Sequence, residues 1–292
     1  MTHSIDGRVA IVTGAGSGLG REHALFLARK GARIVVNDVA PAAADTVAAE
    51  IASSGGIARP FAASVTDESA IAAMVSRTRS DWGRVDILVN NAGILRDKSF
   101  AKMSLDDFRL VLDVHLMGSV ICTKAVWDGM RDQRHGRIVM TTSSSGLYGN
   151  FGQANYSAAK MALVGLMQTL AIEGEKYGIR VNCLAPSAAT QMTQGVLPDA
   201  SLELLSPALV SPVLLGLVCD DAPNRAIVCA GGGHVARASV TLSHGSYVGG
   251  GDDADERAIE KWPQISDRTN EIVPAYGFVQ AEREVASAQA TR

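Results

Sequence analysis

Three side chains in the middle of the chain combine a hydroxyl, a proton donor and a cation: Ser143, Tyr156 and Lys160. Tyr156 and Lys160 are four residues apart, so on a helix both project from one face, with the ammonium near the phenol. A tyrosine has an ordinary pKa of about 10, and a fixed neighbouring cation lowers that pKa toward the range useful for acid–base catalysis. Ser143 follows an expected strand, where its hydroxyl could hold a substrate oxygen. Taken alone, Tyr-x-x-x-Lys is also an ordinary amphipathic pair.

A glycine-rich turn near the amino end predicts a phosphate-binding loop. Residues 13–20 read Thr-Gly-Ala-Gly-Ser-Gly-Leu-Gly, and they join the first expected strand to the first expected helix. This position directs backbone N–H groups and the positive end of a helix at a phosphate, and glycine allows the close approach. A glycine-rich segment can also be only a turn, but its place at the first strand-to-helix junction favours binding. The expected cofactor contacts are Gly14, Ser17, Gly18, Leu19 and Gly20.

Asp38 stands at the end of the second expected strand, twenty-four residues after Gly14. A carboxylate at this place can accept hydrogen bonds from both hydroxyls of an adenosine ribose, and it repels the 2′-phosphate of NADP. The residue therefore predicts NAD as the cofactor. The alternative is an aspartate that caps the helix beginning near Pro41.

Composition excludes several classes of function. The net charge of −3 gives no basic surface for nucleic acid. Four scattered cysteines without a Cys-x-x-Cys pair, and six histidines without ligand spacing, predict neither disulfides nor a metal site. No apolar run approaches the roughly eighteen residues of a membrane span, and no signal peptide is recognisable. We therefore expect a cytoplasmic protein without a membrane span.

The elements that must position these residues alternate regularly along the chain. Short β-branched runs at residues 9–12, 34–36, 87–89, 138–140, 181–184 and 226–229 predict strands. Segments of helical period at residues 21–29, 41–53, 68–81, 105–130 and 157–177 predict helices. This rhythm predicts an α/β fold: a single Rossmann-type, doubly wound parallel sheet with helices on both faces.

The regular rhythm ends near residue 236, which divides the expected Rossmann-fold domain at residues 1–236 from a C-terminal extension at residues 237–292. The extension holds six Lys or Arg and nine Asp or Glu, so it carries the whole net charge of −3. We expect it to be partly irregular and to lie on the surface of the domain. The alternative is an element of a dimer or of a substrate pocket, anchored by Trp262 and Tyr276.

Together these motifs resemble the short-chain dehydrogenase/reductase family over roughly residues 5–236. The resemblance includes Asn-Asn-Ala-Gly at residues 90–93 and Tyr-Ser-Ala-Ala-Lys at residues 156–160. It implies hydride exchange between a secondary alcohol or ketone and NAD, with Tyr156 as acid and base, Ser143 on the substrate oxygen and Lys160 as the cation. Beyond the glycine turn and Asp38, it implies cofactor contacts from Ser64, Val65, Asn91, Ala92, Gly93, Tyr156, Lys160, Pro186 and Thr190.

Residues 90–100 and 146–156 are similar in particular to the (3R)-hydroxyacyl-CoA dehydrogenase region of peroxisomal multifunctional enzyme, which in animals also acts on 17β-hydroxysteroids. His115 stands where most of the family has a catalytic asparagine, as in this branch. We hypothesise that it supports a proton relay toward Lys160, the alternative being a packing histidine inside a helix. The resemblance also implies a homodimer or homotetramer, formed through the helices at residues 105–130 and 157–177.

Two other functions are open alternatives. A 3-oxoacyl-[acyl-carrier-protein] reductase shares residues 153–156 but usually takes NADP, against which Asp38 argues. A catalytically silent, cofactor-binding regulator usually loses the tyrosine or the lysine, and this chain keeps both.

We expect a hydrophobic alcohol or ketone as the substrate, because the segment after Pro186 can form an apolar lid over the site. The alternative is that its apolar residues only pack in the core. These residues are Met192, Val196, Leu197, Leu202, Leu204 and Leu205. The lid contains no Lys or Arg, which favours a steroid slightly over an acyl-CoA.

Overall fold

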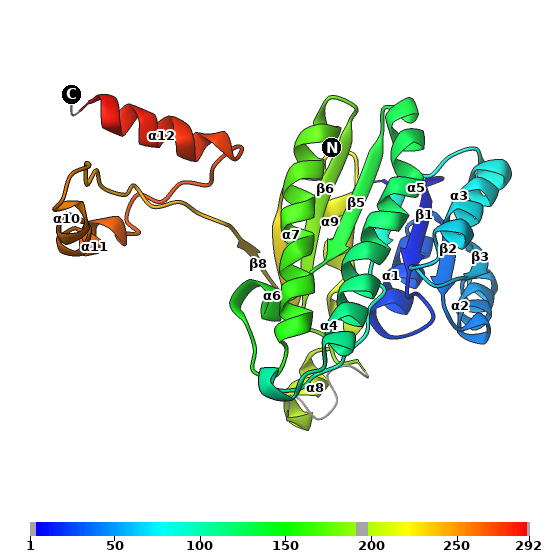
Figure 1. Ribbon diagram of the computed structural model, residues 1–292. Helices are drawn as coiled ribbons and strands as arrows, with labels where there is room; N and C mark the ends of the chain where they lie inside the picture. The colour runs from blue at the N-terminus through cyan, green and yellow to red at the C-terminus, as the bar shows by residue number, and fades with distance from the viewer. Residues whose placement is uncertain (1–3, 191–197, 291–292) are drawn as a thin grey trace. The chain divides into compact units, whose positions relative to one another are not determined.

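The computed structural model describes residues 4–190 and 198–290. Contacts divide the chain into two compact units, Met1–Arg237 and Ala238–Arg292, which are described separately. The first unit is built around one eight-stranded sheet (Figure 1). Its strands are β1 (Val9–Thr13), β2 (Arg33–Asp38), β3 (Ile57–Ala62), β4 (Ile87–Asn90), β5 (Gly136–Thr141), β6 (Ile179–Pro186), β7 (Ile227–Gly231) and β8 (His234–Ala238).

The strand order is β3-β2-β1-β4-β5-β6-β7-β8, and every pair from β3 to β7 is parallel. Every residue of β1, β4 and β5 is buried, because helices cover both faces of the sheet and leave no solvated side. The helices of this unit are α1 (Gly18–Arg29), α2 (Pro41–Ser53), α3 (Glu68–Trp82), α4 (Leu105–Leu112), α5 (Gly118–Gln133), α6 (Ser144–Tyr148), α7 (Ala154–Glu175), α8 (Asp199–Leu204) and α9 (Ser211–Val218). The predicted doubly wound α/β fold is confirmed.

Strand β3 was not among the strands that the sequence predicts. Its residues include Arg59 and Pro60, and a proline within a short apolar run argues against a strand because it cannot donate to a ladder. In the structure, β3 is an edge strand that pairs only with β2, so it can contain a proline. On an edge strand, the missing N–H of Pro60 costs no ladder hydrogen bond.

The prediction of one continuous helix at residues 105–130 is wrong at residues 113–117. A π-helical turn, η2 (Asp113–Met117), separates α4 from α5, and it is closed by a hydrogen bond from the Gly118 amide to the Asp113 carbonyl. The composite stretch Leu105–Gln133 is long and apolar enough to cross a membrane by length and composition. It packs against α3, α7 and β4 inside the sheet unit, which accounts for those of its apolar residues that are buried. The helix predicted at residues 157–177 begins earlier, at Ala154.

The second unit contains helices that the sequence pattern did not predict. They are α10 (Ala254–Glu260), α11 (Trp262–Ile265) and α12 (Phe278–Gln289), and an isolated bridge pairs Leu242 with Ile272. Trp262 and Tyr276, the two expected anchors, keep 64% and 43% of their surface exposed. The helices α10 and α11 have seven and four residues, too few for a helical period to be recognised, whereas α12 has an amphipathic period that the sequence prediction missed.

The topology brings the carboxyl ends of the strands to one edge of the sheet. The chain changes direction across the sheet between β1 and β4, which is where parallel α/β sheets bind ligands. Figure 1 shows α7 beside β5 and β6, so the amino end of α7 lies at this edge.

Candidate active site

Ser143 and Tyr156 meet at the carboxyl end of β5. Ser143 follows the strand by two residues and caps α6, accepting a hydrogen bond from the Ser145 amide at 3.2 Å. Its hydroxyl lies close enough to the Tyr156 phenol to act on it and to lower its pKa. Lys160 lies one turn further along α7, with its Nζ 5.5 Å from the centre of the Tyr156 ring. The structure therefore brings together the serine, tyrosine and lysine selected by their spacing.

Lys160 is buried, and it holds α7 against β5. Its Nζ donates to the Thr141 carbonyl at 2.5 Å, and its own carbonyl accepts from the Thr142 hydroxyl at 2.7 Å. Burial lowers the pKa of the ammonium to about 7, because a charged group loses its hydration in the interior. Its charge is therefore sensitive to pH near neutrality.

The pKa of Tyr156 is raised, not lowered as the sequence predicted. Burial of the phenol has the largest effect and outweighs the hydrogen bond from Ser143, which lowers the pKa, while the nearby Asp97 carboxylate raises it further. Lys160 directs its ammonium at the Thr141 carbonyl, which explains why the expected stabilisation of a phenolate is not dominant. In this state Tyr156 is a protonated phenol at neutral pH and can donate a proton.

His115 lies in the π-turn η2 and packs its ring edge-to-face on Tyr156, with ring centres 5.2 Å apart. Its Nε2 lies 2.8 Å from the Ile94 carbonyl oxygen and 3.0 Å from the Ile94 amide nitrogen, so the backbone of this one residue can serve either tautomer. Burial, and then the charge of Lys160, lower the imidazole pKa to about 3, so the ring is neutral at neutral pH. Among the described residues, its buried Nδ1 has no hydrogen-bond partner. The proton relay stays a prediction.

The glycine loop is closely packed against the segment that follows β4. A Cβ on Gly14 would stand 2.8 Å from the Ala92 Cα, and one on Gly20 would stand 2.1 Å from the Gly14 carbonyl oxygen. The Asn91 side chain donates to the carbonyls of Thr13 and Gly14, at 3.0 and 3.3 Å. Gly14 also adopts a φ of 61°. These contacts fix a loop that no larger residue could form, as close binding of a pyrophosphate requires.

Asp38 is fixed beside the glycine loop by two backbone amides. Its Oδ2 accepts from the Gly16 amide at 2.9 Å and its Oδ1 from the Ala40 amide at 3.0 Å. Each oxygen retains a second lone pair for a hydroxyl donor. The structure assigns the cap of α2 to Ala40, so the alternative of Asp38 as the cap itself does not hold. Asn91, Asp38 and the glycines therefore fit a dinucleotide.

The other predicted cofactor residues have separate local roles. Ala92 donates its amide to the Thr13 hydroxyl at 3.0 Å, and the Ser64 hydroxyl bonds to that of Thr66. Thr190 approaches Gly18, whose added Cβ would lie 3.5 Å from the threonine methyl. The remaining positions are as follows: Ser17 caps α1, Leu19 and Val65 are buried, Pro186 ends β6, and Gly93 lies against His115. Met192, Val196 and Leu197 of the expected lid lie outside the described residues, and Leu204 is exposed.

Several residues that support the site were not selected from the sequence. The Thr13 hydroxyl accepts from the amides of Asn91 and Ala92, each at 3.0 Å. Asn155 accepts from the Tyr156 amide at 2.7 Å and donates to the Arg96 carbonyl at 3.0 Å. Thr13 and Asn155 each bind backbone groups that are distant in sequence, Asn91 and Ala92 for the first and Arg96 for the second, so neither residue type nor spacing could have identified these contacts.

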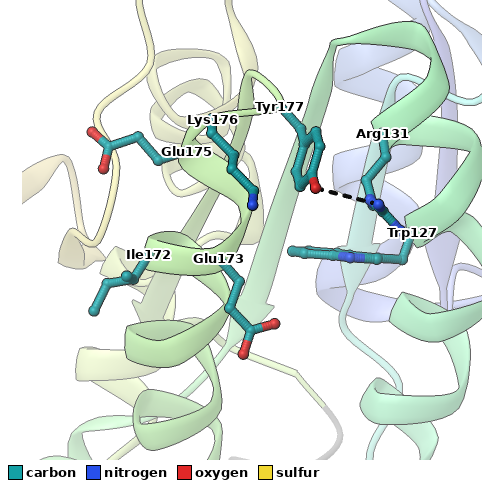
Figure 2. Close-up of a pocket in the computed structure, with 7 residues that line it drawn as sticks. All are labelled: Trp127, Arg131, Ile172, Glu173, Glu175, Lys176 and Tyr177. Atoms are coloured by element: carbon teal, nitrogen blue, oxygen red, sulfur yellow. Dashed lines mark hydrogen bonds between the residues drawn. The ribbon is translucent and has the colours of Figure 1, made fainter.

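A separate cavity of about 530 Å³ lies between α5 and α7, near the carboxyl end of each helix. Figure 2 shows Trp127, Arg131 and Tyr177 on its walls, with the Tyr177 hydroxyl hydrogen-bonded to the Arg131 guanidinium at 3.3 Å. Tyr156 stands at the amino end of α7, the opposite end, so this cavity does not belong to the catalytic site.

Comparison with known proteins places this site in a family. The family model for short chain dehydrogenase matches residues 8–200. A short-chain type dehydrogenase/reductase of Mycobacterium tuberculosis is 45% identical over 273 residues, covering 90% of this chain and 95% of that protein. The peroxisomal multifunctional enzyme type 2 of Drosophila melanogaster is 50% identical over 228 residues, which are 74% of this chain but only 38% of that enzyme.

Solved structures agree with the sequence comparisons. The full-length Drosophila enzyme superposes with a TM-score of 0.84 at 37% identity, covering 99% of this chain and 50% of that chain. A 7α-hydroxysteroid dehydrogenase, solved with NADH and 7-oxo glycochenodeoxycholic acid, superposes with a TM-score of 0.74 at 31% identity, covering 79% and 95%. The chain thus belongs to the short-chain dehydrogenase/reductase family, whose members are nicotinamide-dependent oxidoreductases acting on CH–OH groups.

Proposed function

We propose that this protein is an NAD-dependent dehydrogenase that interconverts a secondary alcohol and a ketone on a bulky apolar substrate, either a (3R)-hydroxyacyl-CoA or a 17β-hydroxysteroid. The proposal rests on the grouping of Ser143 and Tyr156, with buried Lys160 Nζ 5.5 Å from the centre of the Tyr156 ring. This pair stands at the same sheet edge as the glycine loop and Asp38. Similarity to peroxisomal multifunctional enzyme type 2 supports the two substrate classes.

The protein's residues supply proton transfer and orientation. A bound nicotinamide would supply or accept the hydride. Ser143 holds the substrate oxygen, and Tyr156 Oη takes the proton in alcohol oxidation or returns it in ketone reduction. Because the pKa of Tyr156 is raised, its phenol is ready to donate a proton at neutral pH. Lys160 holds α7 against β5 and contributes positive charge below its lowered pKa of about 7.

Asp38 supports NAD in preference to NADP. Its carboxylate is held by two backbone amides at the end of β2, where a 2′-phosphate would meet a fixed negative charge. The alternative, a 3-oxoacyl-[acyl-carrier-protein] reductase, usually takes NADP and is disfavoured for this reason.

A substrate panel tests the proposal. Purified protein and its Tyr156→Phe variant are assayed for NAD reduction with (3R)- and (3S)-hydroxyacyl-CoA and with 17β-hydroxysteroids. We expect oxidation of the 3R alcohol, or of the steroid, and preference for 3R over 3S. The variant should lose turnover by about 100- to 10,000-fold while NAD binding is nearly kept, because only the acid–base group is removed. Inactivity toward all three classes, or a fully active variant, would refute the proposal.

A further inference from the structure

The segment between β4 and α4 is fastened to the amino end of the catalytic helix. The Arg96 carbonyl accepts from the Asn155 side chain at 3.0 Å, Asp97 Oδ2 accepts from Gln153 Nε2 at 2.6 Å, and the Lys98 amide donates to the Gly152 carbonyl at 2.9 Å. Gln153 and Asn155 are buried. Asp97 is close enough to Tyr156 to raise the pKa of its phenol. The segment therefore forms part of the rim of the catalytic site.

This rim carries an unbalanced set of cations. Arg96 Nε and Lys98 Nζ both face Asp107, at 3.9 and 3.0 Å, and about half of each cationic side chain is exposed. Asp107 is held in place by Lys98 and by its own amide, which donates to the Ser104 hydroxyl at 3.1 Å. One carboxylate thus serves two cations. Lys102 is exposed, and in the described part of the chain it makes no ion pair. When Asp97 and Asp107 are counted against Arg96, Lys98 and Lys102, the cluster has three cations against two carboxylates and so carries one net positive charge.

Apolar rings accompany these cations. Phe100, between Lys98 and Lys102 in sequence, is 76% exposed, and Phe151, next to Gly152, is 91% exposed. The hydrogen bond between Lys98 and Gly152 joins the two chain segments that bear the rings. Exposed aromatic side chains beside cations are suited to a ligand that has both a phosphate and an apolar or heterocyclic part.

Resting on the proposed function, we propose that Arg96, Lys98 and Lys102 bind the phosphate groups of a coenzyme A thioester whose acyl hydroxyl reaches Tyr156. A neutral steroid would gain nothing from these cations, whereas a nucleotide thioester gains charge-assisted hydrogen bonds. An acidic carrier protein would present a broad negative surface, whereas these three cations lie in one short segment, beside the Asp106–Arg109 ion pair at 3.1 Å. The site therefore favours a small ligand group that bears phosphates, and it supplies the cations that the apolar lid lacks.

Two thioesters with the same acyl group distinguish the contribution of the coenzyme A phosphates to catalysis from that of the acyl group. We measure kcat/KM for a (3R)-hydroxyacyl-CoA and for the same acyl group on N-acetylcysteamine, which carries no phosphate. In Lys102→Glu, and in Lys98→Gln combined with Lys102→Glu, the ratio of CoA to N-acetylcysteamine efficiency should fall by about tenfold or more, equivalent to about 1.4 kcal/mol. Added salt should lower the ratio in the unmodified protein, because ions screen exposed charges. Lys30→Glu, at the carboxyl end of α1 on the opposite edge, is the matched control and should leave the ratio unchanged.

Calorimetric binding of free coenzyme A gives a second measurement that does not depend on turnover. We expect binding by the unmodified protein and about tenfold weaker binding by the Lys102 variants. No binding of coenzyme A, an unchanged ratio in the variants, or an effect confined to carrier-protein thioesters would overturn the site. A different outcome is that coenzyme A binds, the variants weaken this binding, and neither thioester is oxidised. This outcome would confirm the coenzyme A site and refute the hydroxyacyl substrate of the proposed function.

Discussion

His115 occupies space that only a glycine at position 93 leaves open. A Cβ built on Gly93 would lie 2.2 Å from His115 Cε1, far inside van der Waals contact. The Asn-Asn-Ala-Gly motif thus serves two purposes here: Asn91 supports the glycine loop, and Gly93 admits the imidazole that packs on Tyr156. We infer that His115 is a positioning residue that acts through the Tyr156 ring.

A double-mutant cycle tests this pair. Gly93→Ala alone should destabilise the protein by about 1–3 kcal/mol, because overpacking forces the buried ring aside. In a His115→Ala background the same change should cost much less, giving a coupling of at least about 1 kcal/mol between the two sites in denaturant unfolding. His115→Ala should also lower kcat more than it raises KM for the alcohol, since it removes support from Tyr156 and no substrate contact. Additive free energies of unfolding would contradict the pairing.

Residue types and spacing identified Ser143, Tyr156 and Lys160, because one helical turn and one strand end define their meeting point. They did not predict the direction of the Tyr156 pKa shift. That direction depends on burial and on Asp97, which reaches the site only through the hydrogen bonds of residues 96–98. Electrostatics of this kind depends on distances that a linear sequence does not contain.

The end of β2 and the start of α2 determine how Asp38 faces a cofactor. Gly16 has no room for a side chain, since an added Cβ would lie 2.8 Å from Asp38 Oδ2, and the two residues share a hydrogen bond. The carboxylate is therefore locked by the loop that binds the pyrophosphate in related dehydrogenases. We expect this rigidity, together with the negative charge, to disfavour a 2′-phosphate.

We expect kcat/KM with NAD to exceed that with NADP by at least about tenfold, or about 1.4 kcal/mol. Asp38→Asn removes the charge and keeps an oxygen for only one of the two backbone amides, so it should narrow the NAD-to-NADP ratio and lower Tm modestly. Asp45→Asn, an equal loss of charge at an exposed position of α2, is the control and should leave the ratio intact. Equal use of both cofactors by the unmodified protein would show that Asp38 does not select NAD.

Among the elements, the alternating pattern predicted the buried strands well, because a parallel sheet covered on both faces reads as short β-branched runs. It missed β3, which tolerates Pro60 at the sheet edge, and the π-turn η2, which inserts a residue without interrupting the apolar pattern. Local chemistry therefore predicts whether a buried element exists, whereas edge position and helix irregularity depend on the completed fold.

At the level of the whole molecule, the helices α4 and α7 and the π-turn η2 leave several large apolar side chains exposed in a single chain. Leu105, Leu110, Met117, Met161 and Ile172 on or between these helices each keep at least 40% of their surface exposed. Ile172 also lines the cavity of Figure 2, together with Trp127 and Tyr177. Exposed apolar patches of this kind mark association surfaces, and the family resemblance implies homo-oligomers formed through these helices.

We therefore expect sedimentation or light scattering to give a dimer or a tetramer of the 30.5 kDa chain at micromolar concentration. Burial of Ile172 against a second copy would stabilise the oligomer by about 1.5–3 kcal/mol. Ile172→Asp replaces this side chain with a charge, whose burial is unfavourable, so the measured mass should shift toward that of the monomer. Ile57→Asp is the matched control, because Ile57 is exposed to a similar degree but lies on β3, away from these helices. An unmodified protein that sediments as a monomer, or an Ile172→Asp variant that keeps its full oligomeric mass, would exclude this face as the interface.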